Sequence, residues 1–391
     1  MSGPVGLKPR SLTIHSSQRL RELDGVRGLA IVSVLLWHFL VMPHVLNPAA
    51  PKPPGMVSLA RALSLTWAGV DLFFGLSGFL IAGILLDTKG TPFFLRGFYL
   101  RRVFRIYPIY WAVMALCFVI PLLARQLQLV APPAVYAVLL QNFWMASSRS
   151  FGGDSLGVTW SLSIEEQFYL VLPAIVLLLR RSSLLAVVLA LAVIGAPLAR
   201  LAVSAPPGSN WLAAYVLTIC RADALALGAL LATLARGQVN AGTVSTAARV
   251  LIFVSSVGVV ALIANGDTIG SPAMNVVGYS VLALGAVSVI GLVVSNPQGL
   301  LGRVMRFRPL REAGTISYGL YLIHVPVLLL CRHYLGVASI PATWPAALYA
   351  LLIPAGLSIG LAALSWRLFE RGIVRTGHRL SAAYRQQKIT P

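Results

Sequence analysis

The sequence predicts an all-α polytopic membrane protein, a bundle of about ten transmembrane helices plus one re-entrant or interfacial segment. Of its 391 residues, 58% are hydrophobic and 11% are charged, a composition that a soluble chain could not bury. Apolar stretches of about 20 residues recur along the chain, and each can cross a hydrocarbon layer of ~30 Å. No polar block is large enough for a second domain. We expect an N-terminal segment (1–25), one transmembrane domain (26–370) and a basic tail (371–391).

The apolar stretches give the order of the spans. The first follows a polar, basic start and is longer than the core of a signal peptide, so we expect it to be retained. Residues 134–146 are apolar but too short to cross, and we expect them to be re-entrant or interfacial on the outer side. The spans are expected at 28–46, 66–86, 106–124, 160–179, 183–203, 211–234, 249–265, 273–294, 315–335 and 345–368.

The distribution of Lys and Arg orients this bundle. The net charge is +20, and 24 of the 31 cations lie on the side of the N-terminus, six lie on the other side, and Arg221 lies within a span. The positive-inside rule therefore predicts that both termini are cytoplasmic. The cations form short clusters between spans rather than one basic face, so we expect contact with lipid headgroups and none with nucleic acid.

Several patterns that would indicate other chemistry are absent from the sequence. The three cysteines have no paired spacing and the six histidines have no metal-ligand spacing, so neither a disulfide nor a metal site is predicted. Ser77 lies in a Gly-Leu-Ser-Gly run without the spacing or the strand–turn–helix context of a nucleophile elbow. We assign Ser77 a substrate-contacting or structural role.

Ionisable residues within spans are costly in lipid, which makes them candidates for function. The alternative for each is an ion pair or polar link that holds helices together. His38 lies in the first span, and Arg27 precedes it by eleven residues at the cytoplasmic mouth. Eleven residues make about three turns plus 20°, so both side chains share one face, ~16 Å apart along the axis. An anionic ligand could enter at Arg27 and reach the imidazole with its far end.

Three arginines, Arg101, Arg102 and Arg105, open the third span. Arg102 and Arg105 are three residues apart and therefore share a helix face. Topology alone could explain this cluster. Guanidinium groups also bind phosphates in bidentate fashion, and Arg27 is expected at the same depth. We therefore favour phosphate binding.

Other charged residues in the spans have less defined roles. Asp24 precedes Arg27 by three residues and could hold its guanidinium in place. Glu165 and Glu166 open the fourth span, and because neighbours on a helix point ~100° apart, we expect one to face the bundle and the other the interface. The remaining intramembrane candidates, for substrate contact or structural polarity, are Asp71, Arg221, Asp223 and His324.

Six segments in sequence order resemble the bacterial integral-membrane acyltransferase family three: RELDGVRGLAIVSVLLWH, GVDLFFGLSGFLI, RRVFRIYP, TWSLSIEEQFYLVLP, CRADALALGALLA and SYGLYLIHVPV. The likeness runs from Leu20 to about Glu370. Members of this family are ten-helix membrane proteins that O-acylate sugars of surface polysaccharides, lipopolysaccharide, peptidoglycan or macrolides. The family's Arg–His motif maps onto Arg27 and His38, and its Arg-x-x-Arg motif maps onto Arg102 and Arg105.

The resemblance implies an acyl-CoA-dependent O-acyltransferase of the bacterial cytoplasmic membrane. Acyl-CoA, with acetyl-CoA favoured, would be the donor substrate and no cofactor would be bound permanently; the acceptor would be a carbohydrate or glycoside. The CoA phosphates would bind Arg27, Arg102 and Arg105, beside Arg101. Neutral His38 would act as general base or carry the acyl group itself. Asp71 and Glu166 are the candidates for a carboxylate that steers its tautomer.

Some members of the family carry a soluble esterase-like domain after the membrane part. The sequence shows no such domain, so we expect transfer to finish within the membrane part. Two alternatives stay open. A transporter or flippase of a lipid-linked sugar would need a water-filled pathway and would tolerate loss of His38, although no internal repeat supports it. A scaffold without catalysis would leave the shared face of Arg27 and His38 unexplained.

Overall fold

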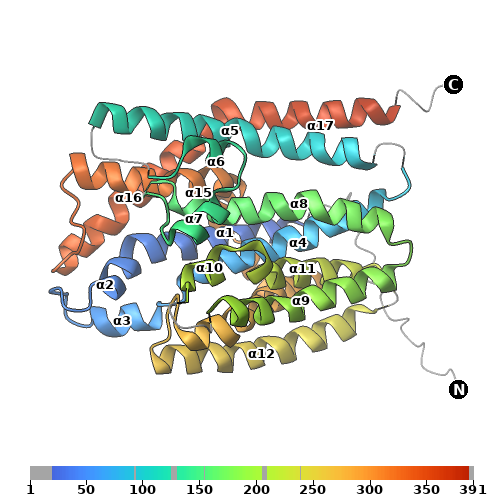
Figure 1. The fold of residues 1–391 in the computed structure, drawn as a ribbon, viewed down its shortest axis with the longest axis horizontal. Helices are drawn as coiled ribbons and strands as arrows, with labels where there is room; N and C mark the ends of the chain where they lie inside the picture. The colour runs from blue at the N-terminus through green and yellow to red at the C-terminus, as the bar shows by residue number, and fades with distance from the viewer. Residues whose placement is uncertain are drawn as a thin grey trace, which may run out of the picture.

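The computed structural model describes residues 20–91, 94–124, 130–153, 155–204, 209–237 and 239–386. These residues form helices and turns without a β-strand among them, which confirms the all-α prediction. Within these described ranges, nine helical segments are long and apolar enough to cross a membrane. Figure 1 shows the long helices side by side, with their axes along the horizontal direction of the view.

The long helices follow the predicted order of spans. They are α1 (Arg21–Leu36, continued by the π-helical η1, Trp37–Val41, and by α2, Met42–Leu46), α4 (Gly69–Thr88), α5 (Phe94–Ala124), α8 (Trp160–Leu178), α9 (Ser182–Ser204), α12 (Ala241–Asn265), α13 (Tyr279–Ser295), α15 (Arg308–Tyr334) and α16 (Trp344–Ser365). The shorter elements are α3 (Met56–Ala62), η2 (Thr66–Ala68), α6 (Pro133–Ala137), α7 (Gln141–Ser148), η3 (Gly157–Thr159), α10 (Trp211–Val216), η4 (Thr218–Cys220), α11 (Ala222–Ala235), η5 (Met274–Gly278), α14 (Leu300–Met305), η6 (Trp366–Glu370) and α17 (Arg371–Gln386).

The span predicted at 211–234 is a broken helix rather than a continuous one. It consists of α10, the turn η4 and α11, and the 14 residues of α11 rise only about 21 Å. At the break, the buried guanidinium of Arg200 donates a hydrogen bond to the carbonyl oxygen of Cys220 at 2.5 Å. A carbonyl released from the helix ladder is thus satisfied by protein, which is the condition for irregular backbone at membrane depth.

The predicted start of the third span is wrong, because its helix extends beyond the apolar stretch. Helix α5 begins at Phe94 instead of 106, so the three arginines near its start lie inside the helix. The region predicted as a basic tail forms helix α17 up to Gln386, which packs along α5, as Figure 1 shows. In this contact the Ser381 hydroxyl donates a hydrogen bond to the carbonyl oxygen of Gly97 at 3.3 Å.

The segment predicted to be re-entrant or interfacial, 134–146, forms parts of α6 and α7. These helices have five and eight residues, which rise only about 8 and 12 Å. Neither can cross a hydrocarbon layer of ~30 Å, so the segment does not add a span.

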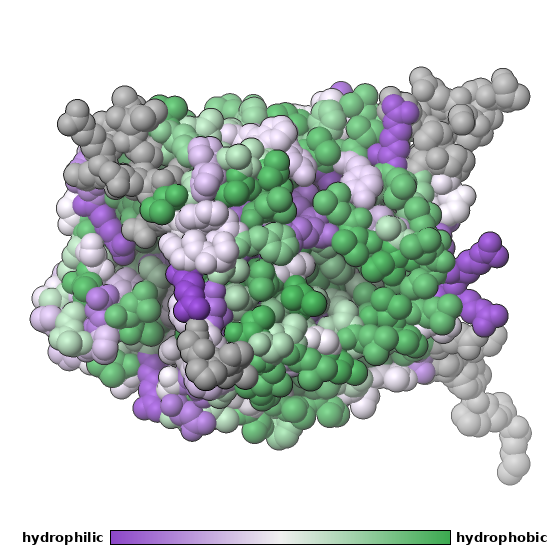
Figure 2. Space-filling view, in the orientation of Figure 1, coloured by the Kyte–Doolittle hydropathy of each residue, from purple (hydrophilic) through white to green (hydrophobic). Residues whose placement is uncertain are grey.

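Both described ends of the chain lie at one end of the bundle. A single cavity there is lined by Leu20, by Arg236 at the end of α11, and by Arg371 and Arg375 of α17. We call this end, with Arg27, Arg102, Arg105 and the cations just named, the basic end. In Figure 2 hydrophobic side chains cover much of the middle of the visible face, and hydrophilic ones project at the right-hand end. This is the distribution expected of a protein surrounded by lipid.

Glycines bring two pairs of helices into backbone contact. A Cβ on Gly28 of α1 would lie 1.8 Å from the carbonyl oxygen of Leu310, and one on Gly314 of α15 would lie 1.8 Å from that of Asp24. A Cβ on Gly228 of α11 would lie 2.0 Å from a carbonyl oxygen of α4. Small residues at such positions allow membrane helices to approach closely. The glycines therefore fix α1 against α15, the pair that carries the two histidines of the site.

Candidate active site

Two adjacent cavities that share part of their lining lie at the basic end of the bundle. The outer cavity has a volume of about 1040 Å³, and its lining includes Leu20 beside α1 and Arg379 of α17. The inner cavity, of about 210 Å³, extends toward the middle of the bundle as far as Tyr321 and Ser161. Six residues line both cavities: Arg27, Leu80, Ile84, Arg102, Arg105 and His378. A long ligand could therefore lie across both, with its charged part among the arginines.

The arginines predicted to bind phosphate do lie together, in the wall that the two cavities share. Arg27 donates a hydrogen bond to Asp24 at 2.9 Å, the contact expected from their spacing. The guanidinium carbon of Arg102 lies 5.4 Å from the ring centre of Tyr169. Neither Arg102 nor Arg105 forms a salt bridge with any residue in the described part of the chain. Arg101 lines the inner cavity and donates to the hydroxyl of Ser381 at 2.5 Å.

Both carboxylates at the start of α8 line the inner cavity. Glu165 accepts hydrogen bonds from Ser77 of α4 at 3.1 Å and from Tyr169 at 2.9 Å. Glu166 accepts one from Tyr107 of α5 at 3.3 Å. The expectation that one of them would face the interface is wrong, because α8 contacts α4 on one side and α5 on the other. Side chains ~100° apart on α8 therefore both point inward.

A pair of histidines lies one helical turn beyond the end of the inner cavity. His38 of η1 and His324 of α15 have ring centres 4.9 Å apart, and Nε2 of His324 lies 3.4 Å from Nδ1 of His38. The Nδ1 atoms contact backbone carbonyls, of Val34 at 2.9 Å and of Tyr321 at 2.7 Å. A carbonyl only accepts, so each neutral ring carries its proton on Nδ1. The lone pair of His38 is then on Nε2.

The local backbone around His38 is unusual for a membrane helix. Residues Trp37–Val41 form a π-helical turn inside the first span, and Pro43 is the second residue of α2, which follows it. Proline cannot donate to the helix ladder, which favours an irregular turn before it. π-Helical turns within α-helices occur frequently at functional sites. The turn sets the imidazole against α15.

No carboxylate is bonded to His38 in the part of the chain that the structure describes, so the predicted contact with Asp71 or Glu166 is wrong. Asp71 accepts a hydrogen bond from Arg221 at 2.8 Å, and both side chains are almost fully buried. Glu166 is bonded to Tyr107, as described above. An ionised carboxylate at membrane depth needs a cation, and Asp71 finds one on the broken helix. The carbonyl of Val34 and the ring of His324 orient His38 instead.

The intramembrane charges of the broken helix have structural partners. Asp223 accepts from Arg200 at 2.9 Å and from Ser280 at 2.9 Å. The guanidinium carbon of Arg221 lies 4.2 Å from the ring centre of Tyr279. The side chains of this region join α4, α9, α11 and α13. The alternative interpretation, a polar link between helices, accounts for these contacts of Arg221 and Asp223.

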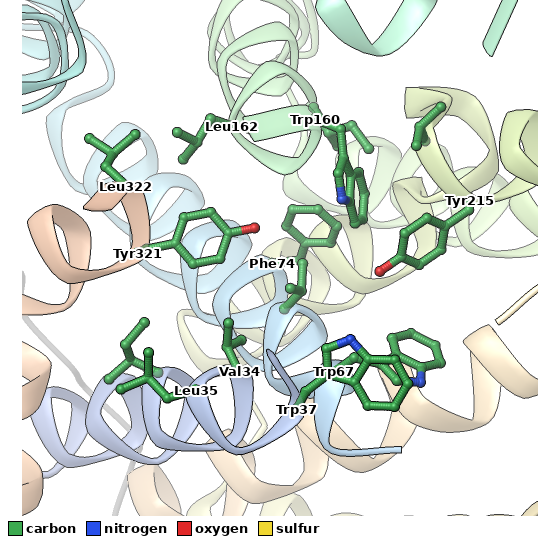
Figure 3. Close-up of a cluster of buried hydrophobic side chains, with 14 of the residues drawn as sticks. Val34, Leu35, Trp37, Trp67, Phe74, Trp160, Leu162, Tyr215, Tyr321 and Leu322 are labelled. Carbon is green, nitrogen blue, oxygen red and sulfur yellow. The ribbon is translucent and has the colours of Figure 1, made fainter. Parts of the chain in front are cut away.

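Tyr321 separates the inner cavity from the histidine pair. Its ring centre is 5.6 Å from that of His324, and its hydroxyl lies 2.7 Å from that of Ser161 and donates to the carbonyl of Val158 at 2.8 Å. Figure 3 shows Tyr321 reaching from α15 toward Phe74, with Tyr215 reaching in from the opposite side. His38 is absent from the described lining of both cavities. The path from the arginines therefore stops at Tyr321 in this structure.

Two sets of residues that line the cavities are not predicted from the sequence. One is Tyr318 and Tyr321, which precede His324 at intervals of three residues and form one stripe on α15. The other is the cationic face of α17. Helical spacing in the basic tail could have indicated that face, since it consists of Arg371, Arg375, His378 and Arg379.

With this geometry established, comparison with known proteins gives the family. The model of a family described as an acyltransferase domain, acyltransferase family three, matches residues 20–364. The chain belongs to this family. The resemblance inferred from six sequence segments is thus confirmed, and the matched region contains the arginines of α1 and α5 and both histidines. No solved structure matches the chain.

Curated relatives have names that refer to O-acetyl transfer. The chain is 28% identical to the peptidoglycan O-acetyltransferase OatA of Listeria monocytogenes, over 93% of this chain and 57% of the relative. It is 28% identical to the putative peptidoglycan O-acetyltransferase YrhL of Bacillus subtilis, with the same coverage. It is 25% identical to the O-acetyltransferase OatA of Staphylococcus aureus, over 96% of this chain and 60% of the relative. The chain thus spans less than two thirds of the length of these relatives.

Proposed function

We propose that this protein is a membrane O-acyltransferase that moves an acyl group from acyl-CoA to a hydroxyl of a carbohydrate or glycoside. Acetyl is the acyl group that we favour. The observation that carries the proposal is the path from the basic end. Arginines from α1 and α5 line its wall, and the histidine pair lies just beyond its inner end. The names of the relatives, which refer to peptidoglycan O-acetylation, support a glycan acceptor.

The charges along the path match the chemistry of an acyl-CoA donor. Arg102 and Arg105 have no ion-pair partner in the described chain, and they can bind a diphosphate in bidentate fashion. Farther in than the arginines, the inner cavity is lined by Glu165, Glu166 and apolar side chains, which offer no cation to a phosphate. Phosphates would therefore stop at the arginines, while the neutral pantetheine arm and its thioester continue inward. By the positive-inside rule the basic end is cytoplasmic, where cells supply acyl-CoA.

The tautomer of His38 suits it to either of two chemical routes. As general base, Nε2 takes the proton of the acceptor hydroxyl while the oxygen attacks the thioester carbon. The C–S bond breaks, and the imidazolium returns the proton to the leaving thiolate. As nucleophile, Nε2 attacks the thioester carbon, the C–S bond breaks and CoA leaves as the thiolate. The acceptor hydroxyl then attacks the acyl-imidazole, the bond between Nε2 and the acyl carbon breaks, and the proton of the hydroxyl passes to the thiolate. In both routes His324 is a positioning residue, because its Nε2, 3.4 Å from Nδ1 of His38, is a second acceptor for the proton that Nδ1 donates to the carbonyl of Val34.

Both routes require the side chain of Tyr321 to move. The ring of Tyr321 lies between the inner cavity and the histidines, and its hydroxyl is held by Ser161 and Val158. Rotation of this ring would join the cavity to Nε2 of His38. We propose that docking of the donor displaces Tyr321, so that the histidine meets the thioester only when acyl-CoA is bound.

The test is transfer of a labelled acetyl group from acetyl-CoA to glycan or glycoside acceptors by the purified protein. General bases contribute typically 10²–10⁴-fold, so His38→Ala should reduce transfer by at least about 100-fold. His333→Ala changes an exposed histidine near the end of α15 and is the matched control. Transfer that survives both His38→Ala and Arg102→Ala/Arg105→Ala unchanged would disprove the mechanism. Translocation of a lipid-linked sugar by His38→Ala liposomes would instead support the flippase alternative.

A further inference from the structure

Helix α17 presents a cationic face to the outer cavity. Arg371, Arg375, His378 and Arg379 recur at helical spacing, within an arc of about 100°, and all four line that cavity. A different side of the helix packs on α5, where Gly377 lies so close to Phe104 that a Cβ would come within 2.5 Å of its side chain. The packing therefore fixes the direction in which the arginines point.

The position of these arginines along the path differs from that of the α5 arginines. Arg102 and Arg105 line both cavities, whereas Arg371, Arg375 and Arg379 line the outer cavity and are absent from the described lining of the inner one. From the histidine pair outward, the path thus meets Tyr321, then the α5 arginines, and then α17. An acyl-CoA molecule has the same linear order of thioester, pantetheine, diphosphate and ribose 3′-phosphate.

We propose that the α17 arginines form the binding site for the ribose 3′-phosphate of the donor. The inference rests on the proposed function and adds a subsite to it. Arg102, Arg105 and Arg27 bind the diphosphate, and Arg375 and Arg379 bind the phosphate monoester through charge-assisted hydrogen bonds. Helix α17, which lies beyond the region matched by the family model, then contributes to donor specificity.

Topology signals and lipid contact are the competing explanations for cations at this end. Arg181 and Arg249 serve as the comparison, because both are exposed and neither lines either cavity. Lipid phosphate offers the same chemistry as the donor's phosphate monoester. The α17 arginines differ from Arg181 and Arg249 because they line a cavity of about 1040 Å³ together with Arg102 and Arg105. The experiment must therefore separate nucleotide from lipid.

The test compares CoA with dephospho-CoA, which lacks only the 3′-phosphate, by calorimetric titration of the full chain in nanodiscs. The variants are Arg375→Gln/Arg379→Gln, the lysine pair Arg375→Lys/Arg379→Lys, and the control Arg181→Gln/Arg249→Gln. Hydrogen bonds to charged groups change affinity by roughly tenfold each. We expect the wild type and the control to prefer CoA by at least about tenfold. The glutamine pair should bind both ligands equally, and the lysine pair should recover part of the preference.

Two results would overturn the inference while the proposed function stands: equal affinity of the wild type for the two ligands, or an unchanged preference in a glutamine pair that binds CoA. Failure of the wild type to bind CoA at all would overturn the proposed function itself. Nanodiscs with and without phosphatidylglycerol provide the lipid arm. If the glutamine pair loses only co-purified phosphatidylglycerol and keeps its preference for CoA, the α17 face is a lipid site and the inference is wrong.

Discussion

Two groups of intramembrane arginines differ in what surrounds them. Arg200 and Arg221 are completely buried, and each has an aspartate within 2.9 Å. Arg102 and Arg105 line cavities and form no salt bridge in the described chain. The first group has its charge balanced within the protein, and the second has room and charge for a ligand. A buried charge in a span therefore indicates a structural role when it has an oppositely charged partner. It indicates a ligand-binding role when it borders a cavity instead.

The largest effect should come from breaking a balanced pair. Asp71→Ala leaves Arg221 buried without its carboxylate, and we expect a loss of about 3–5 kcal/mol in the free energy of unfolding. Replacing both residues, as Asp71→Ala/Arg221→Met, should recover most of that loss because no charge remains buried. Denaturant unfolding in detergent measures both values. If the double variant is as unstable as the single one, the charge is not the cause.

A smaller effect should follow from separating the helices that carry the two histidines. In Gly28→Ala the added Cβ would lie 1.8 Å from the carbonyl oxygen of Leu310, so α1 and α15 must move apart. We expect a loss of about 1–3 kcal/mol in the free energy of unfolding, together with reduced transfer. Gly356→Ala is the control, because no atom lies within 4 Å of its added Cβ. Equal stability of the two variants would show that this contact does not hold the helices.

The smallest effect should come from the positioning histidine. His324→Ala removes the acceptor beside Nδ1–H of His38, and we expect kcat to fall roughly 10–100-fold, as for other residues that orient a histidine through its second nitrogen. KM for acetyl-CoA should not change, because His324 is absent from the described lining of either cavity. Steady-state kinetics at saturating acceptor measure both constants. An unchanged kcat would mean that His324 only packs against His38.

Sequence reasoning worked where a property is local or set by membrane depth. The spans follow from apolar length, Asp24 meets Arg27 three residues away, and the arginines of α1 and α5 meet because each lies at the same end of its span. It failed where tertiary contacts decide. The turn at Thr218–Cys220 contains neither Gly nor Pro, and Arg200 of a neighbouring helix stabilises it.

The partner of His38 and the placement of α17 were beyond sequence reasoning for a similar reason. His324 lies 286 residues from His38 in the chain, and only the packing of α1 on α15 brings them together. The arginines of the last helix match a topology signal in composition. Their common face lines the outer cavity only because Gly377 and Ser381 pack that helix on α5.

The central claim is that the α5 arginines bind a ligand and do not stabilise the fold. One double variant tests it directly. Acetyl-CoA affinity and unfolding free energy should be measured on Arg102→Gln/Arg105→Gln beside Arg181→Gln/Arg249→Gln. We expect the first pair to lose about 100-fold in affinity, roughly tenfold for each charge-assisted contact, with stability within about 1 kcal/mol of the wild type. Unchanged affinity, or a loss of stability as large as that of Asp71→Ala, would contradict the claim.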